Sequence, residues 1–200
     1  MIVDRAAVGV LHALGRSLWG FPPRLMAALV DRGGALRTLA WFAANMPRYE
    51  RTRRALGPLR THLVTTSISL VNGCEYCAFG HGYAMELIYL REHGELFPRS
   101  VDELLALRRR EPDEIRAELA DALEAAGLPD EVPWIERAIA LTAGTAQPTA
   151  NDARLAHLVA MFALLNGTGI ACGTEPDEAH DPVNKDVALK ERLRLLRSAA

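Results

Sequence analysis

The sequence is poor in several features that would assign a protein to a class at once. Its 200 residues contain only three cysteines, a number that is both low and odd. Secreted domains held together by disulfides usually have more cysteines and an even number of them. The cysteine count therefore favours a reducing compartment, and we expect a cytoplasmic protein.

Long apolar runs are also missing. Residues 8–18 are fairly apolar, but His12 and Arg16 interrupt them and no small-residue cleavage site follows. No stretch reaches the roughly 18 unbroken apolar residues of a membrane-spanning helix. We therefore expect neither a signal peptide nor a membrane partner.

Charge of one sign is not in excess either. The formal net charge is −2, so the basic surplus that is typical of nucleic-acid binding is absent, and no block of like charge indicates a disordered tail. The sequence also contains no glycine-rich phosphate loop, no dinucleotide-binding fingerprint and no supported Ser-His-Asp arrangement. We expect no nucleic-acid partner and no cofactor.

What is present is a helical pattern that runs through the whole chain. Alternating apolar and polar residues are nearly absent, and Ala, Leu, Glu and Arg dominate. Hydrophobic residues make up 50% of the sequence, which is enough for a sizeable core. Because no change of composition divides the chain, we predict a single all-α domain over residues 1–200.

Glycine, proline and capping residues predict where the helices begin and end. Pro47 is expected to end one helix, Asn166 and Gly167 another, and residues 168–182 are expected to be irregular. Ser100 and Glu103 form a capping-box pattern at the start of a further helix. The predicted helices cover residues 4–18, 23–33, 35–46, 48–56, 59–71, 74–92, 100–110, 112–127, 132–143, 151–165 and 185–197.

Two of the three cysteines, Cys74 and Cys77, lie in one segment together with His81. Residues at positions i, i+3 and i+7 share one face of a helix. Gly73 precedes them and favours the start of a new helix, whose N-terminus stabilises a thiolate. The segment therefore predicts two thiols and a base at a place that favours ionised sulfur.

This combination favours redox chemistry. A thiolate is the reactive form of cysteine, and His81, one helical turn after Cys77, could serve as its base. A pair of cysteines three residues apart can also close to a disulfide. The helix dipole favours Cys74 as the thiol of lower pKa, whereas the spacing to His81 favours Cys77 as the attacking sulfur, and we choose Cys77. The site is expected to be partly open to solvent.

The pattern Asn-Gly-Cys-x-Tyr-Cys-x-x-x-His after a leucine-rich helix resembles the alkylhydroperoxidase D branch of the carboxymuconolactone decarboxylase superfamily. The resemblance is carried by residues 59–92. It implies an all-helical bundle, a homo-oligomer and a thiol-dependent peroxidase or dithiol-disulfide oxidoreductase. Its partners would be a hydroperoxide substrate and a thiol reductant protein of unknown identity.

The resemblance also implies a role for each matching residue. Cys77 matches the cysteine that becomes a sulfenic acid, Cys74 its disulfide partner, and His81 the relay histidine. The family has a glutamate twelve positions before the first cysteine. In this sequence that position is His62, which brings no fixed negative charge and does not make His81 more basic as a carboxylate would. We include His62 in the candidate catalytic set.

Other interpretations of the same residues stay open. The two cysteines could be half of a zinc site completed by His62 or Cys172, or they could be inert buried thiols. A structural or assembly module that keeps the family fold without its chemistry is a third alternative. Cys172 is expected to be a spare thiol, and His157 and His180, which have no partner at ligand spacing, are expected to be ordinary helix or loop residues.

Overall fold

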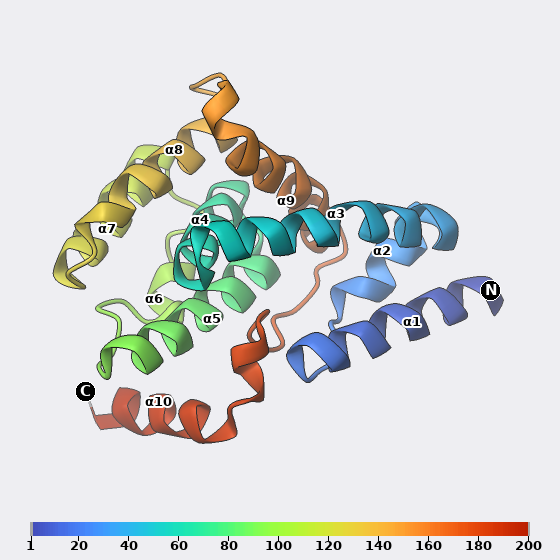
Figure 1. The fold of residues 1–200 in the computed structure, drawn as a ribbon, viewed down its shortest axis with the longest axis horizontal. Helices are drawn as coiled ribbons and strands as arrows, with labels where there is room; N and C mark the ends of the chain where they lie inside the picture. Colours follow the sequence, from blue (N-terminus) through green and yellow to red (C-terminus); the bar gives the residue numbers. More distant parts are fainter. Residues whose placement is uncertain (1, 200) are drawn as a thin grey trace.

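The computed structural model describes residues 2–199 and is helical throughout, with no strand in that range (Figure 1). The all-α prediction is confirmed, while the ends of the predicted domain, residues 1 and 200, lie outside the described residues. The α-helices are α1 (Ile2–Trp19), α2 (Leu25–Gly33), α3 (Ala35–Leu56), α4 (Pro58–Asn72), α5 (Glu75–His93), α6 (Val101–Leu105), α7 (Pro112–Ala125), α8 (Val132–Thr142), α9 (Ala153–Ala171) and α10 (Val187–Ala199). Short 3-10 helices are η1 (Pro129–Glu131), η2 (Ala150–Asp152) and η3 (Pro182–Lys185).

Helices α4 and α5 form the centre of the molecule, and the other helices pack around them (Figure 1). Every residue from Thr61 to Leu70 of α4 is buried, although several are polar. Several of their hydroxyl groups are satisfied within the helix: Thr65 donates to the carbonyl of Thr61, and Ser67 donates to the carbonyl of Leu63. A helix that is buried on all sides can thus carry polar side chains into the core.

The turn between α4 and α5 places the cysteines. Gly73 has φ +78° in the left-handed region, which favours glycine, and its N–H group donates to the carbonyls of Leu70 and Ser69. The N–H group of Cys74 donates to the carbonyl of Ser69 over 2.9 Å. Cys74 is therefore the N-cap of α5 rather than its first helical residue, and Cys77 lies in the first turn.

Helix α3 corrects one prediction. It continues through Pro47, which was expected to divide it into two helices. An internal proline removes a backbone hydrogen bond and costs about 3 kcal/mol or more. The helix is held on both sides of that point by side chains buried in the core, with Phe42 before the proline and Tyr49 and Thr52 after it.

Helix α9 corrects a second prediction, because it does not end at Asn166 and Gly167 but continues to Ala171. The Asn166 side chain is buried and accepts a hydrogen bond from Ser69 of α4 over 3.3 Å, so a tertiary contact overrides the local tendency to end the helix. Residues 150–171 are long and apolar enough to cross a membrane, but 50% of that window is buried inside the fold. Core packing therefore accounts for part of this apolar character, and Leu164 and Ile170 remain exposed.

Helix α6 is shorter than predicted. The capping box is present, with Ser100 accepting from the backbone of Glu103 and Glu103 accepting from the backbone of Ser100, but the helix covers only Val101–Leu105. Several helix starts also differ by about two residues: α1 already includes Ile2, α2 begins at Leu25, α10 begins at Val187, and η2 precedes α9, which begins at Ala153.

The chain between α9 and α10, residues 172–186, forms a connecting segment that runs back across the centre of the molecule (Figure 1). The N–H group of His180 donates to the carbonyl of Gly80 in α5 over 2.9 Å. The side chain of Asn184 donates to the carbonyl of Trp19 at the end of α1 over 2.9 Å. The segment thereby joins α5 to the N-terminal helix.

Candidate functional site

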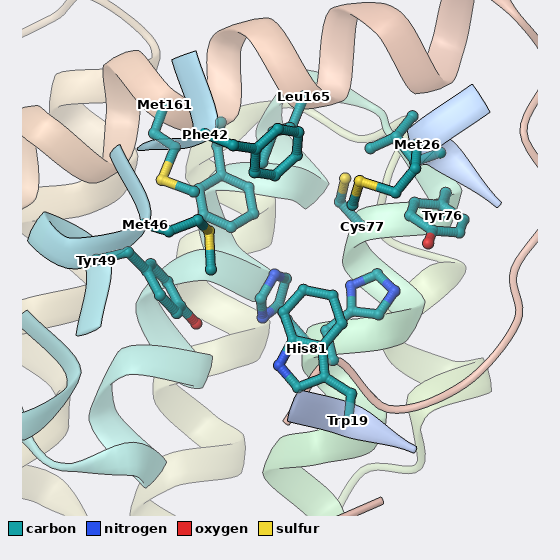
Figure 2. A pocket seen from close by; sticks show the side chains of 13 residues that line it. Trp19, Met26, Phe42, Met46, Tyr49, Tyr76, Cys77, His81, Met161 and Leu165 are labelled. Atoms are coloured by element: carbon teal, nitrogen blue, oxygen red, sulfur yellow. The ribbon is translucent and has the colours of Figure 1, made fainter. Parts of the chain in front are cut away.

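A small cavity lies where α2, α3, α5 and α9 meet, beside the end of α1 and the connecting segment (Figure 2). It has a volume of about 40 Å³, and both Cys77 and His81 contribute to its wall. Most of the remaining wall is aromatic or thioether: Trp19, Met26, Phe42, Met46, Met161 and Phe162. Within this wall only Trp19 and Met46 are partly exposed, so they separate the cavity from solvent.

Both sulfur atoms of the predicted pair are buried. The exposed fraction is 1% for Cys74 and 2% for Cys77. A hydrogen bond from Cys77, together with backbone N–H groups of Cys77 and Tyr76, outweighs burial and lowers the pKa of Cys74. The same hydrogen bond and burial raise the pKa of Cys77. The hydrogen bond from Cys77 therefore makes Cys74 the more acidic thiol, and the backbone N–H groups at the start of the helix add to the effect.

The two sulfurs face different neighbours. Cys77 lines the cavity, whereas Cys74 packs against α9 at Gly169. A Cβ atom added at Gly169 would lie 3.0 Å from the Cys74 sulfur, so this glycine leaves the room that the thiol occupies. Cys77 is therefore the thiol that a molecule in the cavity can reach, whereas Cys74 is the thiol that ionises more easily.

A chain of hydrogen bonds leads away from His81. The Nδ1 atoms of His81 and His62 lie 2.9 Å apart, and Nε2 of His62 lies 3.0 Å from Oδ2 of Asp181. Asp181 in turn accepts a hydrogen bond from the Arg53 guanidinium over 3.2 Å. Residues from α3, α4, α5 and the connecting segment are joined in this chain.

These hydrogen bonds determine which histidine nitrogens carry protons when both rings are neutral. A carboxylate only accepts, so Nε2 of His62 must donate to Asp181. Nδ1 of His62 is then the acceptor, and Nδ1–H of His81 is the donor. This assignment leaves Nε2 of His81 unprotonated and able to act as a base.

Burial and neighbouring groups set the charge states of His81 and Asp181 in this hydrogen-bond network. Burial, and then the neighbouring His62 and His180, lower the pKa of His81 well below its usual value, so the ring is neutral near pH 7. Burial would raise the pKa of Asp181, but the hydrogen bond from His62, the backbone N–H of Val183 and the charge of Arg53 outweigh it. The pKa of Asp181 is therefore lowered, and the side chain is a carboxylate.

A second group of hydrogen bonds and ring contacts involves His180. Its Nε2 lies 3.3 Å from Oδ1 of Asp177, whose other oxygen accepts the Tyr76 hydroxyl over 3.0 Å. The His180 ring is stacked on Trp19 with centroids 5.6 Å apart and meets His81 edge-on at 5.2 Å. His180, which is expected from the sequence to be an ordinary loop residue, therefore lies in the wall of the cavity beside His81.

The structure brings the four predicted site residues, Cys74, Cys77, His81 and His62, into one cluster at the α4–α5 hairpin. The hydrogen bonds of His81 within residues 2–199 go to His62 and not to either sulfur. Cys77 and His81 are only 2% and 5% exposed, so these two side chains are more deeply buried than a partly open site implies.

Sequence reasoning missed Asp177, Asp181 and Tyr49. The first two belong to the run Glu175-Pro176-Asp177-Glu178-Ala179-His180-Asp181, where titratable residues are concentrated in a stretch without helical periodicity. That concentration was the available signal. It does not reveal which helix the stretch packs against, because no spacing rule connects it to α4 or α5.

A metal centre finds no support in the geometry. Among residues 2–199, no three His, Cys, Asp or Glu side chains are arranged to hold a metal ion. Cys172 is exposed, and it contributes to a different surface depression, beside α1 and α2. It therefore does not complete a site with Cys74 and Cys77.

A scan against models of known protein families found no match, and searches of curated proteins and of solved structures found no significant match.

Proposed function

We propose that this protein is a thiol-dependent peroxidase or dithiol-disulfide oxidoreductase of the alkylhydroperoxidase D type. The observation that carries the proposal is the shared wall of one small cavity, where the thiol of Cys77 and the neutral imidazole of His81 both face the same space. Cys74 beside Cys77 supplies the second thiol for a disulfide. The family fold, a cytoplasmic location and a separate thiol reductant protein belong to the same proposal.

In the first step, the Cys77 sulfur forms a bond to one oxygen of a hydroperoxide while the O–O bond breaks. Nε2 of His81 accepts the thiol proton and returns it to the departing oxygen, which leaves as water or an alcohol. The sulfur is oxidised by two electrons to a sulfenic acid, and the peroxide is reduced by the same two electrons. His62 and Asp181 stabilise the transient positive charge on His81 through the hydrogen-bond chain.

In the second step, the Cys74 thiolate attacks the sulfenic sulfur of Cys77, and the S–S bond forms as hydroxide leaves and takes up a proton as water. The lowered pKa of Cys74 supports this role, because the thiolate is the nucleophile. A dithiol reductant then returns two electrons and two protons to the pair. Cys77 thus attacks the peroxide because it lines the cavity, and Cys74 attacks the sulfenic acid because it ionises more easily.

The test is a stopped-flow assay of peroxide consumption with free thiols counted before and after. We expect the wild-type chain to lose the thiols of Cys74 and Cys77 as peroxide is consumed. Cys77→Ser should abolish consumption, whereas Cys172→Ser, which removes the exposed third thiol, should leave it unchanged. Unchanged turnover in Cys77→Ser would reject the assignment.

A second candidate is a helical module that keeps these thiols buried and inert. The low exposure of both sulfurs and the raised pKa of Cys77 favour it. A measurement of thiol pKa separates the two candidates, because an inert pair would show no thiolate below the ordinary cysteine value of about 8.5. Metal analysis of the purified protein tests the zinc alternative in the same preparation.

The proposal includes a homo-oligomer. Large apolar side chains remain exposed on the described surface, among them Leu36 at 79%, Ile170 at 52% and Leu164 at 44%. Leu164 and Ile170 belong to α9, which carries no charged residue after Arg154. Contacts between copies would remove this apolar surface from water.

A further inference from the structure

One polar group in the wall of the cavity has no partner. Tyr49 is only 5% exposed, and its buried hydroxyl forms no hydrogen bond. Figure 2 shows this hydroxyl pointing into the cavity, on the side where His81 lies. Leaving a buried hydroxyl unpaired costs about 1–3 kcal/mol, so an unpaired donor in a binding cavity indicates a ligand that pairs with it.

The hydroxyl can donate but does not ionise here. Burial, with the charge of Asp181 adding to it, raises the pKa of Tyr49 and keeps the phenol neutral. Apart from His81, His180, Tyr76 and Cys77, the rest of the wall consists of thioether, aromatic and aliphatic side chains. A matching ligand therefore presents an oxygen acceptor to Tyr49 and a reactive atom to Cys77.

The size of the cavity limits the ligand. A volume of about 40 Å³ holds a few water-sized molecules, since about 10–15 Å³ is enough for one water. An apolar cavity that binds benzene measures about 150 Å³. Hydrogen peroxide fits the available space, whereas an aromatic hydroperoxide does not fit without displacement of the wall.

We propose that Tyr49 is a substrate-binding residue whose hydroxyl donates a hydrogen bond to an oxygen of hydrogen peroxide held between Cys77 and His81. This inference rests on the proposed peroxidase function. The hydrogen bond orients the O–O bond towards the Cys77 sulfur and stabilises the oxygen that departs when the S–O bond forms. The methionine and aromatic wall excludes larger hydroperoxides.

The test compares two reactions of Cys77 in wild type and Tyr49→Phe, a change that removes only the unpaired oxygen. The first is oxidation by hydrogen peroxide in a single turnover. The second is modification by methyl methanethiosulfonate, a small neutral reagent that reports the reactivity of the thiol without a peroxide. The matched control is Tyr89→Phe, because Tyr89 is also a buried tyrosine, but its hydroxyl has partners in the carbonyl of Ala126 and the carboxylate of Glu95, and it does not line the cavity.

We expect Tyr49→Phe to react about tenfold or more slowly with hydrogen peroxide and at the wild-type rate with the thiosulfonate, while Tyr89→Phe keeps both rates. Wild type should also react at least tenfold faster with hydrogen peroxide than with cumene hydroperoxide.

An unchanged peroxide rate in Tyr49→Phe, or an equal slowing of both reactions, overturns the binding role while the peroxidase proposal stands. Equal rates with the two peroxides overturn the size limit. A wild-type chain that reacts with neither peroxide overturns the proposed function and this inference together.

Discussion

At the scale of single residues, the most informative side chain is Asp181. The sequence places His62 where the resemblance implies a glutamate, so a carboxylate is missing from α4 itself. In the structure, a carboxylate lies 3.0 Å from the far side of His62, contributed by a residue 119 positions away in the chain. The combination His62 plus Asp181 can orient His81 and stabilise its charge as a directly bonded carboxylate would.

Asp181→Asn tests this role. The amide keeps the shape of the side chain but carries no negative charge, and its NH₂ group can turn the His62 tautomer around. We expect peroxide turnover to fall by about 10²-fold, in line with general acid–base contributions of 10²–10⁴. The matched control is Glu191→Gln, which removes a carboxylate from an exposed pair with Arg194 and should leave turnover unchanged. If Asp181→Asn kept the wild-type turnover, the hydrogen bonds that join His81, His62 and Asp181 would not contribute to catalysis.

Residues within the short motif could be predicted from sequence, and their partners from elsewhere could not. Cys74, Cys77 and His81 lie close together because they share one helical segment, a relation that spacing alone predicts. Asp181 reaches His62 only through the course of the connecting segment. Its carboxylate has no local pattern that distinguishes it from the surface acids nearby.

At the scale of elements, the connecting segment depends on one glycine in α5. A Cβ atom added at Gly80 would lie 2.3 Å from the His180 ring, a distance that packed atoms do not tolerate. The absence of a side chain at Gly80 allows His180 to lie against α5 and its N–H group to reach the Gly80 carbonyl. The position of Asp181, the next residue, follows from this contact.

Gly80→Ala should therefore displace the segment. We expect it to lower the free energy of unfolding by about 1–3 kcal/mol, the usual cost of overpacking, and to slow peroxide turnover because Asp181 moves away from His62. Gly9→Ala in α1 is the control, because a Cβ there meets nothing within 4 Å. That change should raise stability by up to about 1 kcal/mol through helix propensity. Chemical denaturation and the peroxide assay measure both effects, and equal behaviour of the two variants would contradict the packing argument.

The elements differ in how far the sequence determines them. Helices with clear local punctuation, such as α5 with Gly94 at its C-terminus, lie where they are predicted. Pro47 and Asn166 are local breakers, and both remain inside helices because buried neighbours hold the chain on either side. Tertiary packing is invisible to a spacing rule, so these helix ends could not be predicted.

At the scale of the whole molecule, the site is closed by parts from both ends of the chain. Trp19 near the N-terminus stacks on His180 near the C-terminus, and both line the cavity. The α4–α5 hairpin supplies the thiols and the histidine pair between them. The environment that keeps His81 neutral therefore exists only when the complete fold has formed, which links the charge of this ring to global stability.

This link predicts how stability depends on pH. Burial lowers the pKa of His81 in the folded state, and burial with Arg48 nearby lowers that of His157. Below pH of about 6.5 the unfolded chain takes up protons that the folded chain does not bind, so stability falls as the pH is lowered. Each unit of difference in pKa is worth about 1.4 kcal/mol. The lowered pKa of Asp181 adds a separate loss only below pH of about 4, the ordinary range of an aspartate.

Urea denaturation at a series of pH values between about 7 and 5 measures the slope of this dependence. We expect His81→Gln to flatten the slope more than His157→Gln, because the folded state resists protonation of His81 more strongly. Glutamine removes the titration while it keeps a polar side chain of similar reach. A wild-type stability that is constant over this range, or an unchanged slope in His81→Gln, would mean that His81 accepts a proton inside the fold. The ring would then be an imidazolium below pH 6.5, and the base assigned to the Cys77 thiol would have to be another group.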